Sequence, residues 1–228
     1  MLWRWAMHKD GLAKSRLSAF LYRFRGYILG FLALVLVAFP PSLFPQQFCI
    51  NDCWAGIIIA IPLFIASACL RIRTRQFIGE HTRGKIHDAD KLVTVGVYSR
   101  VRHPLYISNT GFAVGFIFFH LGVSLWTIPF ILVVVLFEVV LAQNENRFLE
   151  QKFGETWRAW ARKTPNFFPH IFHCCSSCAN PSGSPSTLTS ISPQRSFWQA
   201  FSADRWTWLW LLFCNLVLVI RKVMVFYD

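Results

Sequence analysis

The sequence predicts an all-α membrane protein with four transmembrane helices and a fifth, C-terminal helix that lies in the membrane or at its interface. Hydrophobic types make up 54% of the 228 residues and charged types only 15%, whereas a soluble domain carries about 25% charged residues. Apolar runs of span length, about 20 residues, alternate with blocks of Lys and Arg. This pattern excludes a disordered, collagen-like or ordinary water-soluble protein.

Three apolar runs predict the four spans. The first extends from Tyr27 to Phe44 and the second from Trp54 to Leu70. The third, from Pro104 to Ala142, is about twice the length that one span needs, so we expect a hairpin that turns near His120–Ser124. The first run is longer than the apolar core of a signal peptide and lacks a clear cleavage site, which favours an uncleaved helix.

The positions of the basic residues predict the orientation. Most of them fall in three blocks, 4–25, 71–102 and 147–163, which the hairpin topology places on one side of the membrane. Because Lys and Arg favour the cytoplasmic side, we expect the N-terminus and the active site to be cytoplasmic. We therefore attribute the net charge of +12 to basic residues that set the membrane topology, and we expect no nucleic-acid partner.

The remaining boundaries follow from composition: a basic N-terminus at 1–26, a membrane domain at 27–169, a Cys-, Ser- and Pro-rich linker at 170–196 and an apolar C-terminal helix at 197–228. The core of that last helix, Trp206–Ile220, is shorter than a full span, so it is either a tilted span or an interfacial helix. In the linker, Cys175 and Cys178 have metal-ligand spacing, but no second ligand pair accompanies them. We expect no metal site.

The first chemical signal lies just before the hairpin, where Arg102 and His103 precede Pro104. Proline suits the first turn of a helix, so both side chains should lie at the N-terminus of the third span. Free backbone N–H groups, the helix dipole and a guanidinium together favour an anionic ligand there. Tyr98 and Tyr106 add flat aromatic faces. The alternative for these residues is an anchoring belt at the membrane interface.

The second signal is a pair of acids on the fourth span. Glu138, Leu141, Ala142 and Glu145 share one helical face. Glu145 should emerge about 10 Å beyond Glu138, and the hairpin should return it to the side of His103. Glu138 is an intramembrane acid, which is either functional or a hydrogen-bonded residue of the helix bundle.

The third signal is an amphipathic helix that contains Trp157 and Trp160 and ends at Thr164–Pro169. With the motifs Leu92–Tyr98 and Arg102–Tyr106, it makes the sequence resemble membrane methyltransferases of the isoprenylcysteine carboxyl methyltransferase and phospholipid N-methyltransferase type. The resemblance covers roughly residues 83–169. It implies S-adenosylmethionine as the methyl donor, with catalytic roles for Arg102, His103 and Glu145. The cofactor contacts that it implies are Lys91, Leu92, Val93, Tyr98, His103, Pro104, Leu105, Tyr106 and Glu145.

The resemblance also implies roles for these residues and a class of acceptor. His103 and the helix N-terminus would bind the carboxylate of the cofactor, and Glu145 would accept a hydrogen bond from its amino group or ribose. Tyr98 and Tyr106 would pack against its adenine or sulfonium group. The acceptor would be lipid-like or a prenylated cysteine. Prenylcysteine enzymes have a basic residue where this chain has Leu141, and the second Glu of the family motif is Asn146 here. Two alternatives stay open: a membrane NADPH-dependent sterol-type reductase and an inactive membrane adaptor.

Overall fold

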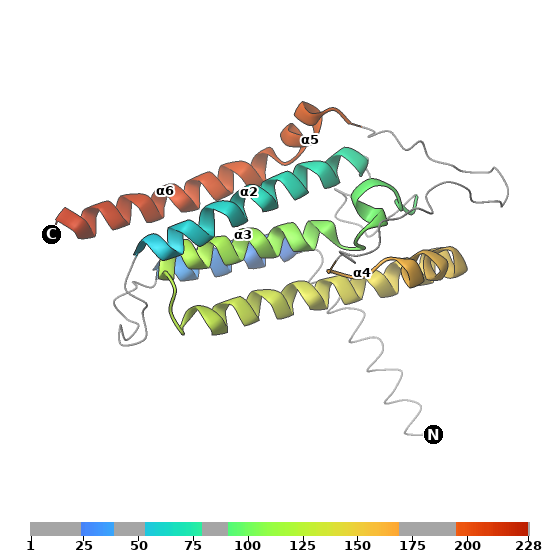
Figure 1. Ribbon diagram of the computed structural model, residues 1–228, viewed down its shortest axis with the longest axis horizontal. Helices are drawn as coiled ribbons and strands as arrows, with labels where there is room; N and C mark the ends of the chain where they lie inside the picture. Colours follow the sequence, from blue (N-terminus) through green and yellow to red (C-terminus); the bar gives the residue numbers. More distant parts are fainter. Residues whose placement is uncertain (1–23, 39–52, 79–90, 169–194, 228) are drawn as a thin grey trace, which may run out of the picture.

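The computed structural model describes residues 24–38, 53–78, 91–168 and 195–227, and every regular element in these ranges is helical. The predicted all-α class is therefore confirmed for this part of the chain. Figure 1 shows the long helices side by side along one axis. In chain order the helices are Phe24–Ala38, α2 (Cys53–Phe77), the 3₁₀ helix η4 (Gly96–Ser99), α3 (Pro104–Leu121), α4 (Thr127–Lys163), α5 (Phe197–Ala203) and α6 (Arg205–Tyr227).

In the described part of the chain, three helices are long and apolar enough to cross a membrane: Ala55–Phe77, Pro104–Leu121 and Thr127–Lys163. A fourth follows if the pair α5 and α6, bent by 64°, counts as one span. The predicted first span is described only as the shorter helix Phe24–Ala38, and the rest of its expected range lies outside the described residues. The protein is therefore a multi-pass membrane protein, with at least three helices of span character.

The predicted hairpin is confirmed. Helix α3 ends at Leu121, α4 begins at Thr127, and the turn includes Gly122, whose φ of 68° suits glycine. The hydroxyl of Thr127 donates to the carbonyl of Ser124 at 2.6 Å, which closes the first turn of α4. This turn lies at one end of the bundle, and the N-terminus of α3 lies at the other (Figure 1).

Helices α2 and α3 pack closely because small residues line their contact. A Cβ on Gly56 would collide with the backbone of Phe118 and Gly122, so this position requires glycine. Further along, the hydroxyl of the buried Ser108 donates to the carbonyl of Ser67 at 2.9 Å. Small residues and hydrogen bonds of this kind bring membrane helices together, since lipid provides little hydrophobic force between them.

The C-terminal helix belongs to the bundle core. One apolar cluster joins the helix Phe24–Ala38 to α3, α4 and α6, and its members are Leu36, Phe116, Ile117, Leu121, Val134, Cys214 and Leu218. Helix α6 includes the apolar core Trp206–Ile220 and continues to Tyr227. The bend before it is closed by the stacked rings of Phe201 and Trp208, 5.2 Å apart.

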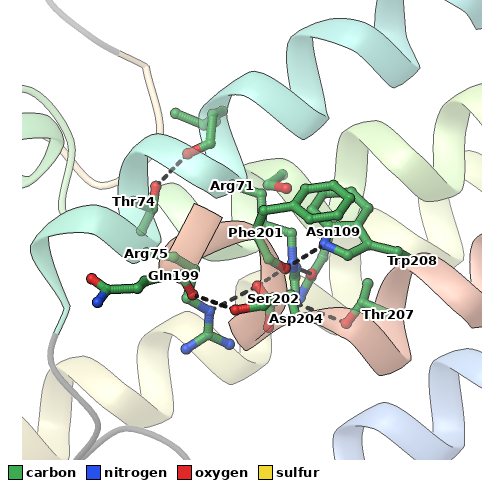
Figure 2. Close-up of polar contacts among 12 residues, drawn as sticks. Arg71, Thr74, Arg75, Asn109, Gln199, Phe201, Ser202, Asp204, Thr207 and Trp208 are labelled. Carbon is green, nitrogen blue, oxygen red and sulfur yellow. Dashed lines mark hydrogen bonds and ion pairs between the residues drawn. The ribbon is translucent and has the colours of Figure 1, made fainter. Parts of the chain in front are cut away.

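Helix α2 is also longer than predicted, since it continues past Leu70 to Phe77. The reason is a buried ion-pair cluster, which Figure 2 shows in close-up. Asp204, at the bend between α5 and α6, accepts from the Nε of Arg71 at 2.9 Å and from the Nε of Arg75 at 2.8 Å. Arg71 and Arg75 therefore lie in a packed helix, whereas the sequence placed them in the basic block after the second apolar run.

The predicted N-terminal region 1–26 and linker 170–196, with its Cys–His motif, lie almost wholly outside the described residues. Within the described part of the chain, no group of three His, Cys, Asp or Glu side chains is arranged to hold a metal ion.

Candidate cofactor site at the N-terminus of α3

The segment after α4 folds back over the residues before α3. Helix α4 contains a break at Gly154 (φ 53°, ψ −124°), a conformation that favours glycine. Beyond its end, the carbonyls of Pro165 and Asn166 accept the backbone N–H groups of Arg102 and His103 at 2.9 and 3.2 Å. The predicted anion site at this helix terminus therefore has two of its N–H groups already bonded. Residues 164–167 form what we call the cover segment.

His103 connects the two helices of the hairpin. It is 4% exposed, and its Nε2 lies 2.9 Å from Oδ1 of Asn146 on α4. The amide nitrogen of Asn146 donates to Oδ1 of Asn166 at 3.1 Å, which leaves its oxygen to face the imidazole. His103 therefore carries its proton on Nε2 and donates it to Asn146. On the other side of the ring, Nδ1 lies 3.9 Å from Oε2 of Glu145.

The protonation state of His103 determines what can bind between its Nδ1 and the Oε2 of Glu145. Burial lowers its pKa below the ordinary 6.5 and Arg102 acts in the same direction, while Glu145 and the bond to Asn146 oppose the change. The ring is thus neutral at pH 7. With Nε2 protonated, Nδ1 is an acceptor that faces an acceptor oxygen of Glu145. An N–H or O–H donor from a ligand can bond to both.

Arg102 and Trp157 form the complementary, donor side of the site. The Arg102 guanidinium lies 5.8 Å from the centre of the Trp157 ring, and its Nε donates to the carbonyl of Thr164 at 2.7 Å. In the described part of the chain no carboxylate pairs with Arg102. The indole N–H of Trp157 is buried and has no acceptor. A cation beside an unsatisfied N–H suits an anionic ligand.

Aromatic rings surround the imidazole. Tyr106 and Phe167 lie with their ring centres 5.6 and 5.8 Å from that of His103. Tyr106 is buried against Leu141 and Ala142 of α4. Tyr98, in η4, joins the group through its backbone carbonyl, which accepts the indole N–H of Trp160 at 3.2 Å. This bond attaches η4 to the end of α4.

The structure brings together several of the predicted residues. His103, Tyr106 and Glu145 meet across the hairpin, and Pro104 occupies the first turn of α3 as expected. Leu105 is half-buried in the same turn. In the segment before η4, Lys91 is exposed, and Leu92 and Val93 are half-buried. Among the described residues, no hydrogen bond or ion pair joins these three side chains to His103 or Glu145.

Sequence reasoning missed three participants: Asn146, Trp157 and Asn166. It treated Asn146 as the loss of a family glutamate, whereas the amide links His103 to the cover segment. It named Trp157 only as part of an amphipathic helix, whereas the buried indole N–H is a donor without an acceptor. A groove of about 470 Å³ lies elsewhere, between the helix Phe24–Ala38 and α6, and is lined by Val37, Ala38, Val217, Ile220 and Met224.

Comparisons with known proteins agree with the motifs. Residues 55–156 match the family model described as phospholipid methyltransferase, a range that runs from α2 to just before Trp157. The nickel-cobalt-cadmium resistance protein NccN of Alcaligenes xylosoxydans xylosoxydans is 35% identical over 81 residues, which are 36% of this chain and 37% of that protein. The chain thus matches little more than a third of the length of this relative. No solved structure matches. The stretch 55–156 therefore matches the membrane methyltransferase family whose motifs the sequence carries.

Proposed function

We propose that the protein is an integral membrane methyltransferase that uses S-adenosylmethionine to methylate a lipid-like acceptor at the cytoplasmic face. The observation that supports this most directly is the meeting of His103 and Glu145, 3.9 Å apart, beside Arg102 and the unsatisfied N–H of Trp157. All but Trp157 lie in the segment that matches the family.

The residues present fit the chemical groups of S-adenosylmethionine. Its amino and ribose hydroxyl groups are donors, which suit the two acceptors of His103 and Glu145. Its carboxylate is an anion, which suits Arg102 and Trp157. The rings of Tyr106 and Phe167 suit the adenine or the sulfonium. When bound, the cofactor supplies an electrophilic methyl group.

The chain's own contribution is binding, orientation and exclusion of water. His103 and Glu145 set the position of the cofactor across the hairpin, and Asn146 holds the imidazole in one tautomer. The cover segment shields the same residues from solvent through its bonds to Arg102 and His103. Alignment of the reacting groups in a dry site accounts for much of the rate of a displacement reaction.

The acceptor is proposed from the surroundings of the site. The helices around it are those of span character, so an acceptor with an apolar tail can reach it from the bilayer. Leu141 is fully buried where prenylcysteine enzymes have a basic residue. A prenylcysteine carboxylate would therefore lack its cationic partner, and another lipid head group is the better candidate. The cytoplasmic face is proposed from the three basic blocks.

The decisive experiment measures binding of S-adenosylhomocysteine, the product of the cofactor, to purified protein in lipid nanodiscs by calorimetry. We expect saturable binding that His103→Ala abolishes and that Glu155→Ala, at an exposed position, leaves unchanged. Labelled-methyl transfer to total membrane lipid then tests activity. Absence of binding by folded wild-type protein would refute the proposal, and thermal protection by NADPH instead would support a reductase.

A further inference from the structure

The surface around α5 presents large aromatic side chains that the described part of the chain leaves uncovered. Trp198 is 74% exposed, Trp206 70% and Phe197 49%. In Figure 1 this short helix lies at the edge of the bundle. We call Phe197, Trp198, Phe201, Arg205 and Trp206 the α5 face. Rings of this kind collect where a membrane meets water, because the body of an indole is apolar while its N–H bonds to head groups.

Helix α6 is long enough to cross the membrane without α5. Its 23 residues extend about 34 Å, and the apolar core of a bilayer is only about 30 Å thick. A bend of 64° separates the two helices. When α6 lies along the membrane normal, α5 is therefore closer to the plane of the membrane than to its normal.

The bend is held in one shape, so the α5 face has a fixed direction. Asp204 at the bend binds Arg71 and Arg75, and the indole N–H of Trp208 donates to the carbonyl of Phe201 at 2.9 Å. Figure 2 shows Arg71, Asp204 and Trp208 gathered at this point. Because these contacts oppose rotation about the bend, the aromatic rings keep their orientation relative to α2 and α6.

The α5 face lies at the same end of the bundle as the candidate cofactor site. The backbone N–H of Arg195, just before α5, donates to the carbonyl of Gln76 in the last turn of α2 at 3.2 Å. The next residue of α2, Phe77, packs against Gly96 of η4, where a Cβ would collide with the phenyl ring. An α5 face at the membrane interface therefore sets η4 and the N-terminus of α3 at the level of the lipid head groups.

The charges around α5 determine which lipid suits this face. Helices α2, α5 and α6, with the bend between the last two, contain one acid, Asp204, which is buried and paired. Arg205 is exposed, and its guanidinium lies 5.7 Å from the centre of the Trp206 ring. In the described part of the chain no carboxylate pairs with Arg205. A guanidinium beside indole N–H groups suits the oxygens of a phosphate.

A second copy of the chain offers no matching acid for Arg205. Outside the cofactor site, the acids that the structure describes are Glu138, Glu150, Glu155 and Asp204. The first and last of these are buried, and the other two both bond to Arg158. A lipid anion is therefore the complementary partner.

We propose that the α5 face binds anionic phospholipids at the membrane–water interface, with its rings at the head-group level and Arg205 on a lipid phosphate. Aromatic side chains supply the apolar contact of an interfacial helix, and a basic residue adds attraction to anionic lipid. The inference is independent of the proposed function, because no residue of the α5 face belongs to the candidate cofactor site.

The test places the photoreactive residue p-benzoylphenylalanine in place of Trp198 in the full chain, in nanodiscs of phosphatidylcholine with a minor share of phosphatidylglycerol. Because Trp198 is largely exposed, the exchange leaves the packing intact. After irradiation, mass spectrometry identifies the crosslinked molecules. We expect lipid adducts in which phosphatidylglycerol exceeds its share of the bilayer about fivefold, the factor that attraction to one basic residue gives. Salt at about 1 M should abolish this excess, because exposed charges are then screened.

Two variants and a second probe position make the result specific. Arg205→Gln should bring phosphatidylglycerol down to its share of the bilayer. The matched control is Arg73→Gln, which removes an exposed arginine two positions from Arg71 and hence on the opposite face of α2, and it should leave the excess unchanged. The same probe in place of Leu212, an exposed residue of α6, should crosslink to both lipids in proportion to their shares.

An equal excess with and without Arg205→Gln, or one that persists in high salt, would overturn the inference. So would a probe at Trp198 that crosslinks to no lipid while the probe at Leu212 does, since the α5 face would then lie in water. A crosslink from the Trp198 position to a second copy of the chain would overturn it as well.

Discussion

Replacing Asp204 by alanine should detach the C-terminal helices from the segment that carries the family match. Asp204 is 4% exposed, and the two arginines that it binds are 8% and 9% exposed. The substitution leaves both guanidinium groups buried without their shared carboxylate. Removing one partner of a buried ion pair costs about 3–5 kcal/mol, and all three groups are buried enough that solvent screening reduces this little. The expected loss corresponds to a factor of about 10² to 10⁴ in the unfolding equilibrium.

The assay is equilibrium unfolding in mixed detergent micelles, followed by tryptophan fluorescence, because Trp208 lies one turn after Asp204 and stacks on Phe201. The matched control is Asp204→Asn, which keeps one acceptor oxygen and should lose less stability. A second control, Arg158→Ala, removes an exposed arginine that bonds to Glu150 and Glu155 and should leave stability almost unchanged, because surface ion pairs contribute little. A loss below about 1 kcal/mol for Asp204→Ala would refute the reasoning.

Two further predictions concern the cofactor site. The pKa of His103 is lowered in the folded protein, so just below pH 6.5 the unfolded chain binds more protons than the folded one. The contribution of His103 to stability should therefore be constant above pH 6.5 and should fall as the pH drops through that value. His103→Gln should lose this part of the pH dependence in unfolding measured from pH 5 to 8, and an unchanged profile would contradict a neutral, buried ring. Trp157→Phe should weaken S-adenosylhomocysteine binding about tenfold, because it removes the N–H that lacks an acceptor and keeps an aromatic ring beside Arg102. The smaller ring also leaves a void at a buried position, so unfolding of the same sample should show a modest loss of stability. Unaltered affinity in calorimetry would exclude the indole N–H from the site.

Local pattern was sufficient for much of the architecture. The length of the apolar run 104–142 predicted a hairpin, and Pro104 marked the first residue of α3, because span length and helix initiation depend on neighbouring residues. The helical period placed Glu145 beyond Glu138 on one face of α4. The hairpin then brought Glu145 to His103, as expected, because two antiparallel helices with a short turn must meet along their length.

What local pattern missed depends on contacts between distant residues. Arg71 was placed beyond the end of the second span because its partner, Asp204, lies 133 positions away and comes into contact only when α6 packs on the bundle. Asn146 was taken as a lost glutamate because its partner Asn166 belongs to the cover segment, which reaches it only after the chain breaks helical geometry at Gly154. The sequence placed Glu138 within a span; only tertiary packing, which commits Arg71 to Asp204, left its carboxylate without a partner.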